Sequence, residues 1–267
     1  MTVSGGLLGV FAHPDDEAYS LAGCMARYVQ EGIAVTNLCF TRGEAGQIAE
    51  GSGATRETLG EVREKELRAA CAELGVTDVR IIGTPDGGTQ SDEAGVETIA
   101  SAMRELQPRV VVTMEPHGVT NHPDHIAVSQ MTSDAFERVR GESGGSFPAR
   151  LYYAAIPASA LEAFTAELQR RGLGGLTAPD DPLALRPAPD DSIAAVVDVS
   201  AWYEQKIAAL RAHLTQTFEM VGWMPEDVMP VMLGTESFQR RFPSPVPGEA
   251  PEADLFAAFR NADGSLA

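Results

Sequence analysis

The sequence is poor in positive charge. Only 20 lysines and arginines stand against 38 aspartates and glutamates, which gives a formal net charge of −18. Phosphate binding needs a positive surface, so this balance excludes a non-specific nucleic-acid binder and argues against docking on anionic lipid. A small neutral substrate, or one held by a metal ion, suits this charge better. Most of the carboxylates are expected to be solvated surface groups.

Cysteines and long apolar runs are also scarce. The three cysteines, Cys24, Cys39 and Cys71, are widely spaced and form no CxxC pair, so they are predicted to be reduced core residues rather than a thiolate metal site. The first residues have neither the basic region nor the apolar run that is typical of a signal peptide, and no stretch is apolar enough to span a membrane. A cytoplasmic protein is expected.

The length of 267 residues favours one large domain, and the 44% hydrophobic content is enough for a core. Short apolar runs alternate with amphipathic helical patterns, which predicts a Rossmann-like α/β fold with a mostly parallel sheet flanked by helices. The expected strands cover residues 7–12, 34–40, 79–82, 109–114, 150–156 and 193–199. The expected helices cover residues 18–30, 60–74, 96–106, 124–139, 159–172 and 201–213.

The regions between and beyond these elements are rich in loop-forming residues. Residues 41–58 are predicted to form a long functional loop, and the Pro- and Asp-rich residues 177–192 a loop or lid. The portion after about residue 150 is less regular. We expect a single domain over residues 1–267, with its core over about residues 5–241 and a surface tail over residues 242–267.

Histidine is rare, yet three of the five histidines stand in two short motifs. The first motif, His13-Pro14-Asp15-Asp16-Glu17, follows the first expected strand, at the strand end where open α/β sheets bind ligands. His13 and Asp16 are three residues apart in a turning segment, so both can face one point and hold Zn²⁺ or a similar metal. Asp15 points elsewhere and is free to act as a base. Capping and the helix dipole also favour acids at a helix start, but they do not explain His13.

The second motif, His122-Pro123-Asp124-His125, follows the strand expected to end near Met114 and leads into a helix. His125 would complete a His-Asp-His set, and a catalytic zinc site keeps three protein ligands beside an open position for water. His122 could polarise or protonate the reacting group, and Asp124 could orient a histidine through its second nitrogen. The alternative is a turn with two surface histidines. It competes poorly, because two such motifs stand at two strand ends.

Together these segments resemble a known family, the zinc-dependent N-acetylglucosaminyl deacetylases. This is the LmbE-like or PIG-L family, which includes the mycothiol and bacillithiol pathway deacetylases and the mycothiol-conjugate amidases. The resemblance covers residues 7 to about 240. It rests on AHPDDE at 12–17, TRGEAG at 41–46, the helix with Arg63 and Glu66, PDG at 85–87, GVTNHPDH at 118–125 and a late pattern from Lys206 through His213 to Gln216.

The resemblance implies roles that agree with the residue chemistry. Family residues that match His13, Asp16 and His125 bind zinc. The residue that matches Asp15 is the general base. The match to His122 assists as acid or oxyanion stabiliser, and the match to Asp124 tunes it.

The resemblance also implies residues that contact the sugar, namely the matches to Glu44, Arg63 and Asp86. For Arg63 an exposed helix position, and for Asp86 simple turn chemistry, are equally good explanations. His213 either reaches the rim of the site or is a capping or core histidine.

One position departs from the family pattern. Some members carry a tyrosine two residues before the first histidine of HPDH, where it can stabilise the oxyanion, and here that position is Thr120. Oxyanion stabilisation would then fall to zinc and His122, or to a residue from another loop.

The sequence therefore predicts a hydrolase that removes the acetyl group from the N-acetylglucosamine moiety of a small glycoconjugate, with zinc-activated water and Asp15 as base. Fe²⁺, Co²⁺ or Mn²⁺ could occupy the same ligands. The expected partner is a small N-acetyl sugar conjugate, without nucleic acid or membrane, and a homo-oligomer stays open. An amidase acting on a mycothiol-like thiol conjugate is the main alternative. An inactive metal-binding module would not need Asp15 and His122, and a nucleotide-dependent oxidoreductase would need a GxGxxG cradle.

Overall fold

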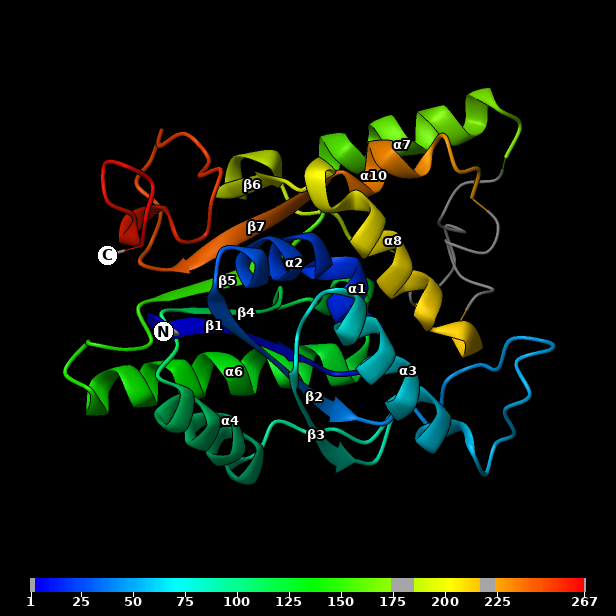
Figure 1. The fold of residues 1–267 in the computed structure, drawn as a ribbon, viewed down its shortest axis with the longest axis horizontal. Coiled ribbons are helices and arrows are strands. Elements are labelled where there is room, and N and C mark those ends of the chain that lie inside the picture. The colour runs from blue at the N-terminus through cyan, green and yellow to red at the C-terminus, as the bar shows by residue number, and fades with distance from the viewer. Residues whose placement is uncertain (1–2, 174–184, 217–223, 267) are drawn as a thin grey trace.

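The computed structural model describes residues 3–173, 185–216 and 224–266. One sheet of seven strands runs through these residues in the order β3-β2-β1-β4-β5-β7-β6 (Figure 1). Strands β1 to β5 pair in parallel, whereas β7 is antiparallel to both β5 and β6. The predicted α/β class with a mostly parallel sheet is confirmed. The strands are β1 (Val3–Phe11), β2 (Ile33–Thr41), β3 (Asp78–Thr84), β4 (Val110–Met114), β5 (Arg150–Ala154), β6 (Ala195–Asp198) and β7 (Thr235–Phe242).

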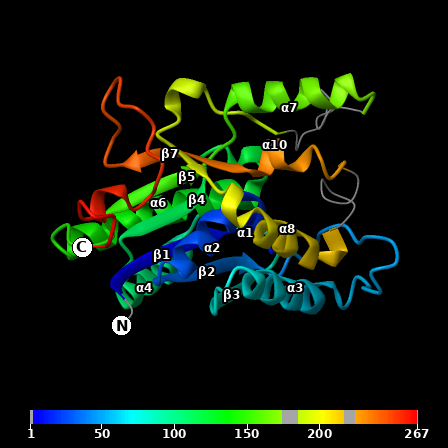
Figure 2. The same ribbon diagram turned by 45° about the horizontal axis from the view of Figure 1, so that its top comes forward.

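Helices cover both faces of this sheet (Figure 1). Helices α4 and α6 lie together on one face, and α8 packs against α1, α2 and α3 on the other, as both ribbon views show (Figures 1 and 2). The helices are α1 (Asp16–Ser20), α2 (Ala22–Gln30), α3 (Leu59–Glu73), α4 (Glu93–Leu106), α5 (Gly118–Asn121), α6 (Pro123–Glu142), α7 (Ala158–Arg170), α8 (Tyr203–Ala212) and α10 (Met229–Leu233).

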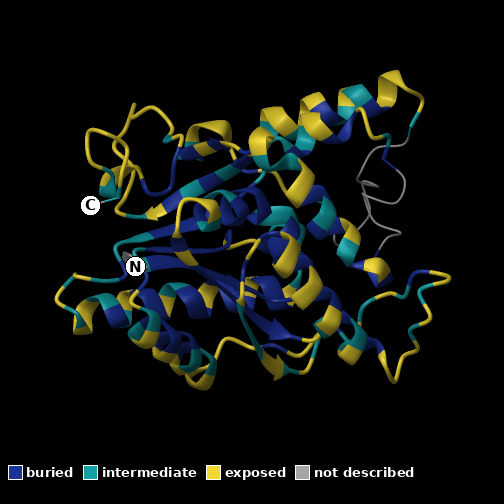
Figure 3. Cartoon of the chain, viewed as in Figure 1, coloured by how far each residue is buried: buried dark blue, intermediate teal, exposed yellow. Residues whose placement is uncertain are grey.

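The central strands are buried on both faces, which explains their continuous apolar runs (Figure 3). Successive side chains of a strand point to opposite faces, so Val110 and Val112 join the core under α2, α3 and α8, whereas Val111 joins the core under α4 and α6. The three cysteines are buried and unpaired, as predicted. Among the residues that the structure describes, no helix has the length and apolar character needed to cross a membrane.

The predicted helix over residues 18–30 is two helices. The helix is interrupted at Leu21, and α2 begins at the next residue. The backbone N–H groups of Gly23 and Cys24 in the first turn of α2 donate to the carboxylate of Glu236, at 2.8 and 2.9 Å. This carboxylate satisfies donors that a helix start leaves without partners, so the second helix can begin in the core.

Strand β7 is absent from the predicted elements. Its side chains do alternate in burial, but two of the inward positions carry the charged residues Glu236 and Arg240 on either side of Phe238. Each charge has a partner there, Lys206 for Glu236 and Glu252 for Arg240. Buried charges disguise the alternation of apolar and polar residues by which a strand is found in a sequence.

The segment after Phe242 is not entirely a surface tail. Leu255 and Phe256 are fully buried, and the ring of Phe256 lies 4.8 Å from that of Tyr28 in α2. The Tyr28 hydroxyl donates to Asp254 and accepts from the N–H of Leu255. The expectation of a tail therefore fails for these residues. The predicted loop over residues 41–58 begins with the last residue of β2, Thr41, and residues 42–58 form neither helix nor strand. Much of the predicted lid, residues 177–184, lies outside the described residues.

Candidate active site

The two histidine motifs lie at the same edge of the sheet. The first follows β1 and the second follows β4, and these parallel strands are neighbours in the sheet. Glu44 follows β2 and Asp86 follows β3, which continue the sheet on the other side of β1. The chain leaves β1 and β4 in different directions, and such a switch point at the carboxyl ends of strands is where open α/β sheets bind ligands.

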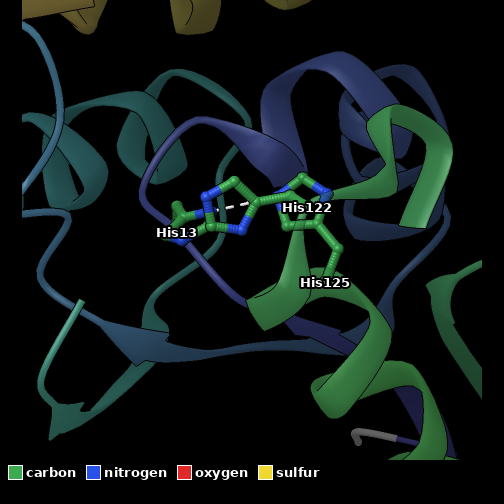
Figure 4. A group of neighbouring side chains, drawn as sticks. All are labelled: His13, His122 and His125. Carbon is green, nitrogen blue, oxygen red and sulfur yellow. Dashed lines mark hydrogen bonds between the residues drawn. The ribbon is translucent and has the colours of Figure 1, made fainter. Parts of the chain in front are cut away.

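Figure 4 shows the rings of His13, His122 and His125 gathered at this point. The hydrogen bonds of His13 and His125 decide which ring nitrogen carries the proton. Nδ1 of His125 lies 2.8 Å from the carbonyl oxygen of Gly118, which can only accept, so Nδ1 carries the proton and Nε2 keeps a lone pair. Nε2 of His13 lies 3.0 Å from Oδ1 of Asp86 and 3.3 Å from Oδ2 of Asp124, so in the neutral ring Nε2 carries the proton and Nδ1 of His13 keeps the lone pair.

These two lone pairs meet a third donor, the carboxylate of Asp16. Nδ1 of His13 and Nε2 of His125 are 3.0 Å apart, Oδ1 of Asp16 is 3.2 Å from the latter, and Oδ2 is 3.8 Å from the former. Ligands bound tetrahedrally to zinc at about 2.0–2.1 Å are separated by ~3.3 Å. The three donors predicted from the sequence therefore lie close together, in a cluster of His and Asp side chains that could hold a divalent metal ion.

Among the described residues, two groups offer ligand atoms that all lie within 4.8 Å of one another, and neither contains Asp16: His13 with His122 and His125, and His13 with Asp86 and Asp124. In the second group both carboxylates already accept from Nε2 of His13. They fix the ring rather than compete with it, as carboxylates behind metal-binding histidines do.

The charged side chains of the site shift one another's pKa values. Burial alone would lower the pKa of His13, but hydrogen bonds to Asp124 and Asp86 and the charge of Asp16 raise it to about 10. Burial would raise the pKa of Asp16, yet His125 and His13 hold it well below its usual range. Oδ2 of Asp16 also accepts from the backbone N–H groups of Ala12 and His13, at 3.1 and 2.9 Å. Asp16 is therefore a fixed anion.

Asp15, the predicted base, is buried next to this cluster and held by Arg63. The guanidinium Nη2 donates to Oδ2 of Asp15 at 2.7 Å and to the carbonyl oxygen of Pro14, and Nη1 donates to that of Gly43 at 3.0 Å. Burial raises the pKa of Asp15, although the charge of Arg63 opposes the rise. A raised pKa brings a carboxylate closer to the operating range of a general base.

Arg63 is 3% exposed, so it is not the exposed helix residue that the sequence left open. Its guanidinium donates hydrogen bonds to the carboxylate of Asp15 and to the backbone carbonyls of Pro14 and Gly43. The structure therefore places Arg63 beneath the base, and a contact with the sugar stays a prediction.

His122 is half-buried and also has a defined tautomer. Its Nδ1 accepts from the N–H of Asp124 at 3.2 Å and caps the start of α6, so the neutral ring carries its proton on Nε2. Burial lowers the pKa of His122, and the rings of His13 and His125 lower it further. His122 is thus a neutral hydrogen-bond donor near pH 7, which suits the stabilisation of an oxyanion.

Asp124 is fully buried and contacts both His13 and His122, the first through its carboxylate and the second through its backbone N–H. Its carboxylate contacts His13 rather than His122 and also accepts from the N–H groups of Gly87 and Thr89, at 2.8 and 3.1 Å. The expectation that Asp124 orients a histidine through its second nitrogen agrees with this geometry. Against the effect of burial, the charge of Asp124 also raises the pKa of His122, and the N–H of Asp124 donates to that ring, so the expected tuning of His122 stays a prediction.

Glu44 and Asp86, the other predicted sugar contacts, link the loops after β2 and β3 through side-chain to backbone hydrogen bonds. Oε1 of Glu44 accepts from the N–H of Asp86 at 3.0 Å, and Oδ2 of Asp86 accepts from the N–H of Ala45 at 2.9 Å. Burial would raise the pKa of Asp86, but the hydrogen bond with His13 lowers it to about 2. Oε2 of Glu44 is buried without a hydrogen-bond partner, which leaves an acceptor for a ligand hydroxyl.

Sequence reasoning missed the residue that shapes the loop before the second motif. Glu115, directly after β4, accepts from the N–H groups of His117 and Val119 at 3.1 and 2.8 Å. Val119 has a φ of 60°, which is unusual for a β-branched residue and needs such support. The loop presents the Gly118 carbonyl to His125. Its position directly after a strand was the only signal for Glu115.

The hydroxyl of Thr120, where some relatives carry a tyrosine, is 3.4 Å from the carbonyl oxygen of Gly118. This short side chain leaves His122 as the side-chain donor of the second motif.

Comparison with known proteins identifies the family. The profile of the family described as GlcNAc-PI de-N-acetylase, PIG-L, matches residues 8–136. A 1D-myo-inositol 2-acetamido-2-deoxy-alpha-D-glucopyranoside deacetylase of Salinispora arenicola is 34% identical, over 97% of this chain and 92% of the relative. The protein of that name from Geodermatophilus obscurus is 35% identical, over 97% of this chain and 99% of the relative. The chain belongs to the PIG-L family.

Solved structures support the fold of this family member. A conserved protein of Thermus thermophilus superposes with a TM-score of 0.57 at 25% identity, over 91% of this chain and 96% of that protein. The N,N'-diacetylchitobiose deacetylase of Pyrococcus horikoshii gives 0.59 at 18% identity, over 91% and 84%. The 4-carboxy-2-hydroxymuconate hydratase of Pseudomonas putida gives 0.61 at 18%, over 92% and 100%. A hydratase among the neighbours shows that the fold alone does not determine the reaction.

Proposed function

We propose that this protein is a metal-dependent hydrolase that removes the acetyl group from the N-acetylglucosamine moiety of a small glycoconjugate. The observation that carries the proposal is the convergence of lone pairs from His13 and His125 on the anionic Asp16. When both rings are neutral, these electron pairs repel unless a proton or a metal ion lies between them, and the N/N/O donor set suits Zn²⁺. The names of the similar curated relatives, which describe deacetylation of a glucosamine-inositol, support this substrate class.

A metal ion held by His13, Asp16 and His125 would polarise the amide carbonyl and lower the pKa of a water molecule from 15.7 to roughly 7. Asp15 accepts the proton of the attacking water. The Nε2–H of His122 donates to the carbonyl oxygen as negative charge develops on it. The C–N bond then breaks, the proton held by Asp15 passes to the amine nitrogen, and acetate and free amine are the products. Asp124 and Asp86 keep the His13 ring in its orientation throughout.

The substrate would lie over the two loops that carry Glu44 and Asp86 and that are joined by their hydrogen bonds. Oε2 of Glu44 is the unpartnered acceptor there, and a sugar hydroxyl is a donor of the matching kind. The cross-links between the two loops hold these carboxylates in place before the substrate arrives, which lowers the cost of ordering them on binding.

An acetate-release assay tests the proposal. Metal-stripped and zinc-restored protein would be incubated with N-acetylglucosaminyl-inositol, other N-acetylglucosaminides and a thiol conjugate of the mycothiol type. We expect acetate and free amine in equal amounts from the first substrate, none after chelation, and recovery on addition of zinc. Failure of the metal-loaded protein to release acetate from any N-acetyl sugar would contradict the proposal. Cleavage of the thiol conjugate alone would identify an amidase instead.

A further inference from the structure

Two buried ionisable side chains lie behind the proposed site and take no part in the reaction above. Glu17 in α1 is fully buried, and His213, the C-terminal cap of α8, is 2% exposed. Nε2 of His213 lies 2.9 Å from Oε1 of Glu17, although the two residues are 196 positions apart in the sequence. A buried carboxylate is costly unless it is paired and hydrogen-bonded, so His213 supplies a partner that Glu17 requires.

The other oxygen of Glu17 reaches the backbone of the proposed base. Oε2 accepts a hydrogen bond from the N–H of Asp15 at 3.0 Å. One carboxylate therefore joins the end of α8 to the peptide group that carries Asp15.

Asp15 needs such support because its backbone is strained. Its φ is 115° and its ψ is −28°, in a region that residues other than glycine seldom adopt. Such a conformation persists only where the surroundings hold it. Arg63 fixes the Asp15 carboxylate and the preceding carbonyl, while Glu17 fixes the N–H of the same residue.

We propose that His213 and Glu17 are positioning residues that hold Asp15 in its strained conformation, so that the carboxylate is aligned to accept the proton of water. This inference rests on the proposed function, in which Asp15 is the base. Misplacement of a reacting group by about 1 Å costs roughly 10²-fold in rate, so the loss of this support should lower kcat without removing the metal or the substrate.

The next residues of the chain offer a matched control. Thr215 donates through its N–H and its hydroxyl to the buried carboxylate of Glu66 in α3, at 2.8 and 2.6 Å. Like His213, Thr215 links the end of α8 to a buried carboxylate. The carboxylate that His213 contacts, Glu17, also accepts from the N–H of Asp15, whereas the one that Thr215 contacts, Glu66, does not. Thr215→Val removes the two hydrogen bonds of the hydroxyl, to Glu66 and from Nε2 of Gln216, and keeps the N–H bond to Glu66.

Kinetics on metal-loaded protein provide the first readout. In His213→Ala we expect kcat to fall about 10- to 100-fold, with KM within about threefold of wild type and metal stoichiometry unchanged. In His213→Gln, whose side-chain amide can still donate to Glu17, most of kcat should return. In Thr215→Val kcat should stay within about twofold of wild type. A merely structural role would lower the thermal midpoints of His213→Ala and Thr215→Val alike, without a difference in kcat.

Amide hydrogen exchange at Asp15, followed by NMR, provides a readout that does not depend on activity. We expect exchange at this N–H at least tenfold faster in His213→Ala than in wild type, and unchanged in Thr215→Val. Unchanged exchange at Asp15 in His213→Ala overturns the proposal whatever the kcat, and so does a loss of metal that accounts for the loss of activity. If wild type releases no acetate, the proposed function fails, and the exchange rates still decide whether His213 supports Asp15.

Discussion

At the residue scale, the chemistry of the site depends on which nitrogen of each histidine carries a proton. The Gly118 carbonyl fixes one tautomer in His125, and Asp86 and Asp124 fix the opposite one in His13. The backbone N–H of Asp124 fixes the tautomer of His122. Two rings thereby become electron-pair donors and the third a hydrogen-bond donor, so three side chains of one type take two different tasks.

Asp15→Ala should separate metal binding from turnover. The metal donors stay in place, so we expect one equivalent of zinc by elemental analysis. Loss of a general base removes about 10²–10⁴-fold in rate, and kcat should fall accordingly. A variant that turns over like wild type would refute the assignment of the base.

His13→Ala should lose the metal itself. The variant removes one of three donors and frees the carboxylates of Asp86 and Asp124 from their shared partner. We expect substoichiometric zinc after dialysis and no acetate release at ambient metal concentration. Thr120→Ala, in the loop before the second motif, is the control and should keep its zinc. A fully metallated and active His13→Ala would rule out the ligand set.

Metal affinity should depend on pH, because protons compete for His13. The carboxylates around this ring raise its pKa to about 10 against the effect of burial, so a proton occupies the metal-free ring at all lower pH values. Metal binding must displace that proton, and the affinity should fall about tenfold for each pH unit between about 9 and 7. Competition titrations with a chromogenic chelator would measure this slope. A flat profile would show that His13 does not release a proton on binding.

The sequence reveals the donors and one side chain that orients them, Asp124, but not the backbone groups that do the same. His13, Asp15, Asp16 and His125 stand in two motifs whose spacing and place after strands indicate their roles. The Gly118 carbonyl that orients His125 has no sequence signature, because every residue carries such a group.

At the element scale, β7 joins helices that the chain order keeps apart. Glu236 on this strand accepts from the first turn of α2 and from Nζ of Lys206 in α8, the latter at 2.7 Å. The sequence predicted α8 and the region of α2 from their apolar periodicity. It did not predict β7, because the charges that make these connections occupy inward positions where apolar residues are expected.

Lys206→Met should test this connection. Lys206 is 1% exposed, and its removal leaves Glu236 as a buried charge without its counter-ion. We expect the free energy of unfolding, from urea titration, to fall by about 3–5 kcal/mol. Arg211→Met on the same helix removes a solvent-exposed ion pair with Glu226 and should cost less than about 1 kcal/mol. Equal effects of the two substitutions would contradict a special role for the buried pair.

At the scale of the whole molecule, both ends of the chain contribute to one core. Leu255 and Phe256 pack with Tyr28 of α2, near the start of the sequence. Proline, glycine and glutamate dominate the residues before them. This composition predicts a surface segment, so the burial of these two apolar side chains was not predicted from the sequence. The α/β order was predictable because its periodicity repeats many times, whereas a single short contact leaves no pattern.

Phe256→Ala should therefore destabilise the protein as a core substitution does. Truncation of a buried phenylalanine costs about 3–5 kcal/mol, and the thermal midpoint should drop accordingly. Val246→Ala in the same C-terminal segment is the control, because Val246 is 65% exposed and should change the stability by less than about 0.5 kcal/mol. A Phe256→Ala variant as stable as wild type would show that this segment is a surface tail, as its composition suggests.

The long separation between Glu17 and His213 affects the order in which the protein matures on the ribosome. His13, Asp16 and His125 have all been synthesised long before α8. Contacts between distant parts of a chain close a large loop and form late in folding. A nascent chain that has emerged only as far as α6 already carries every proposed metal donor, but Glu17 still lacks its partner. Metal uptake and catalytic competence would thus be successive events, because the ion can bind before α8 docks.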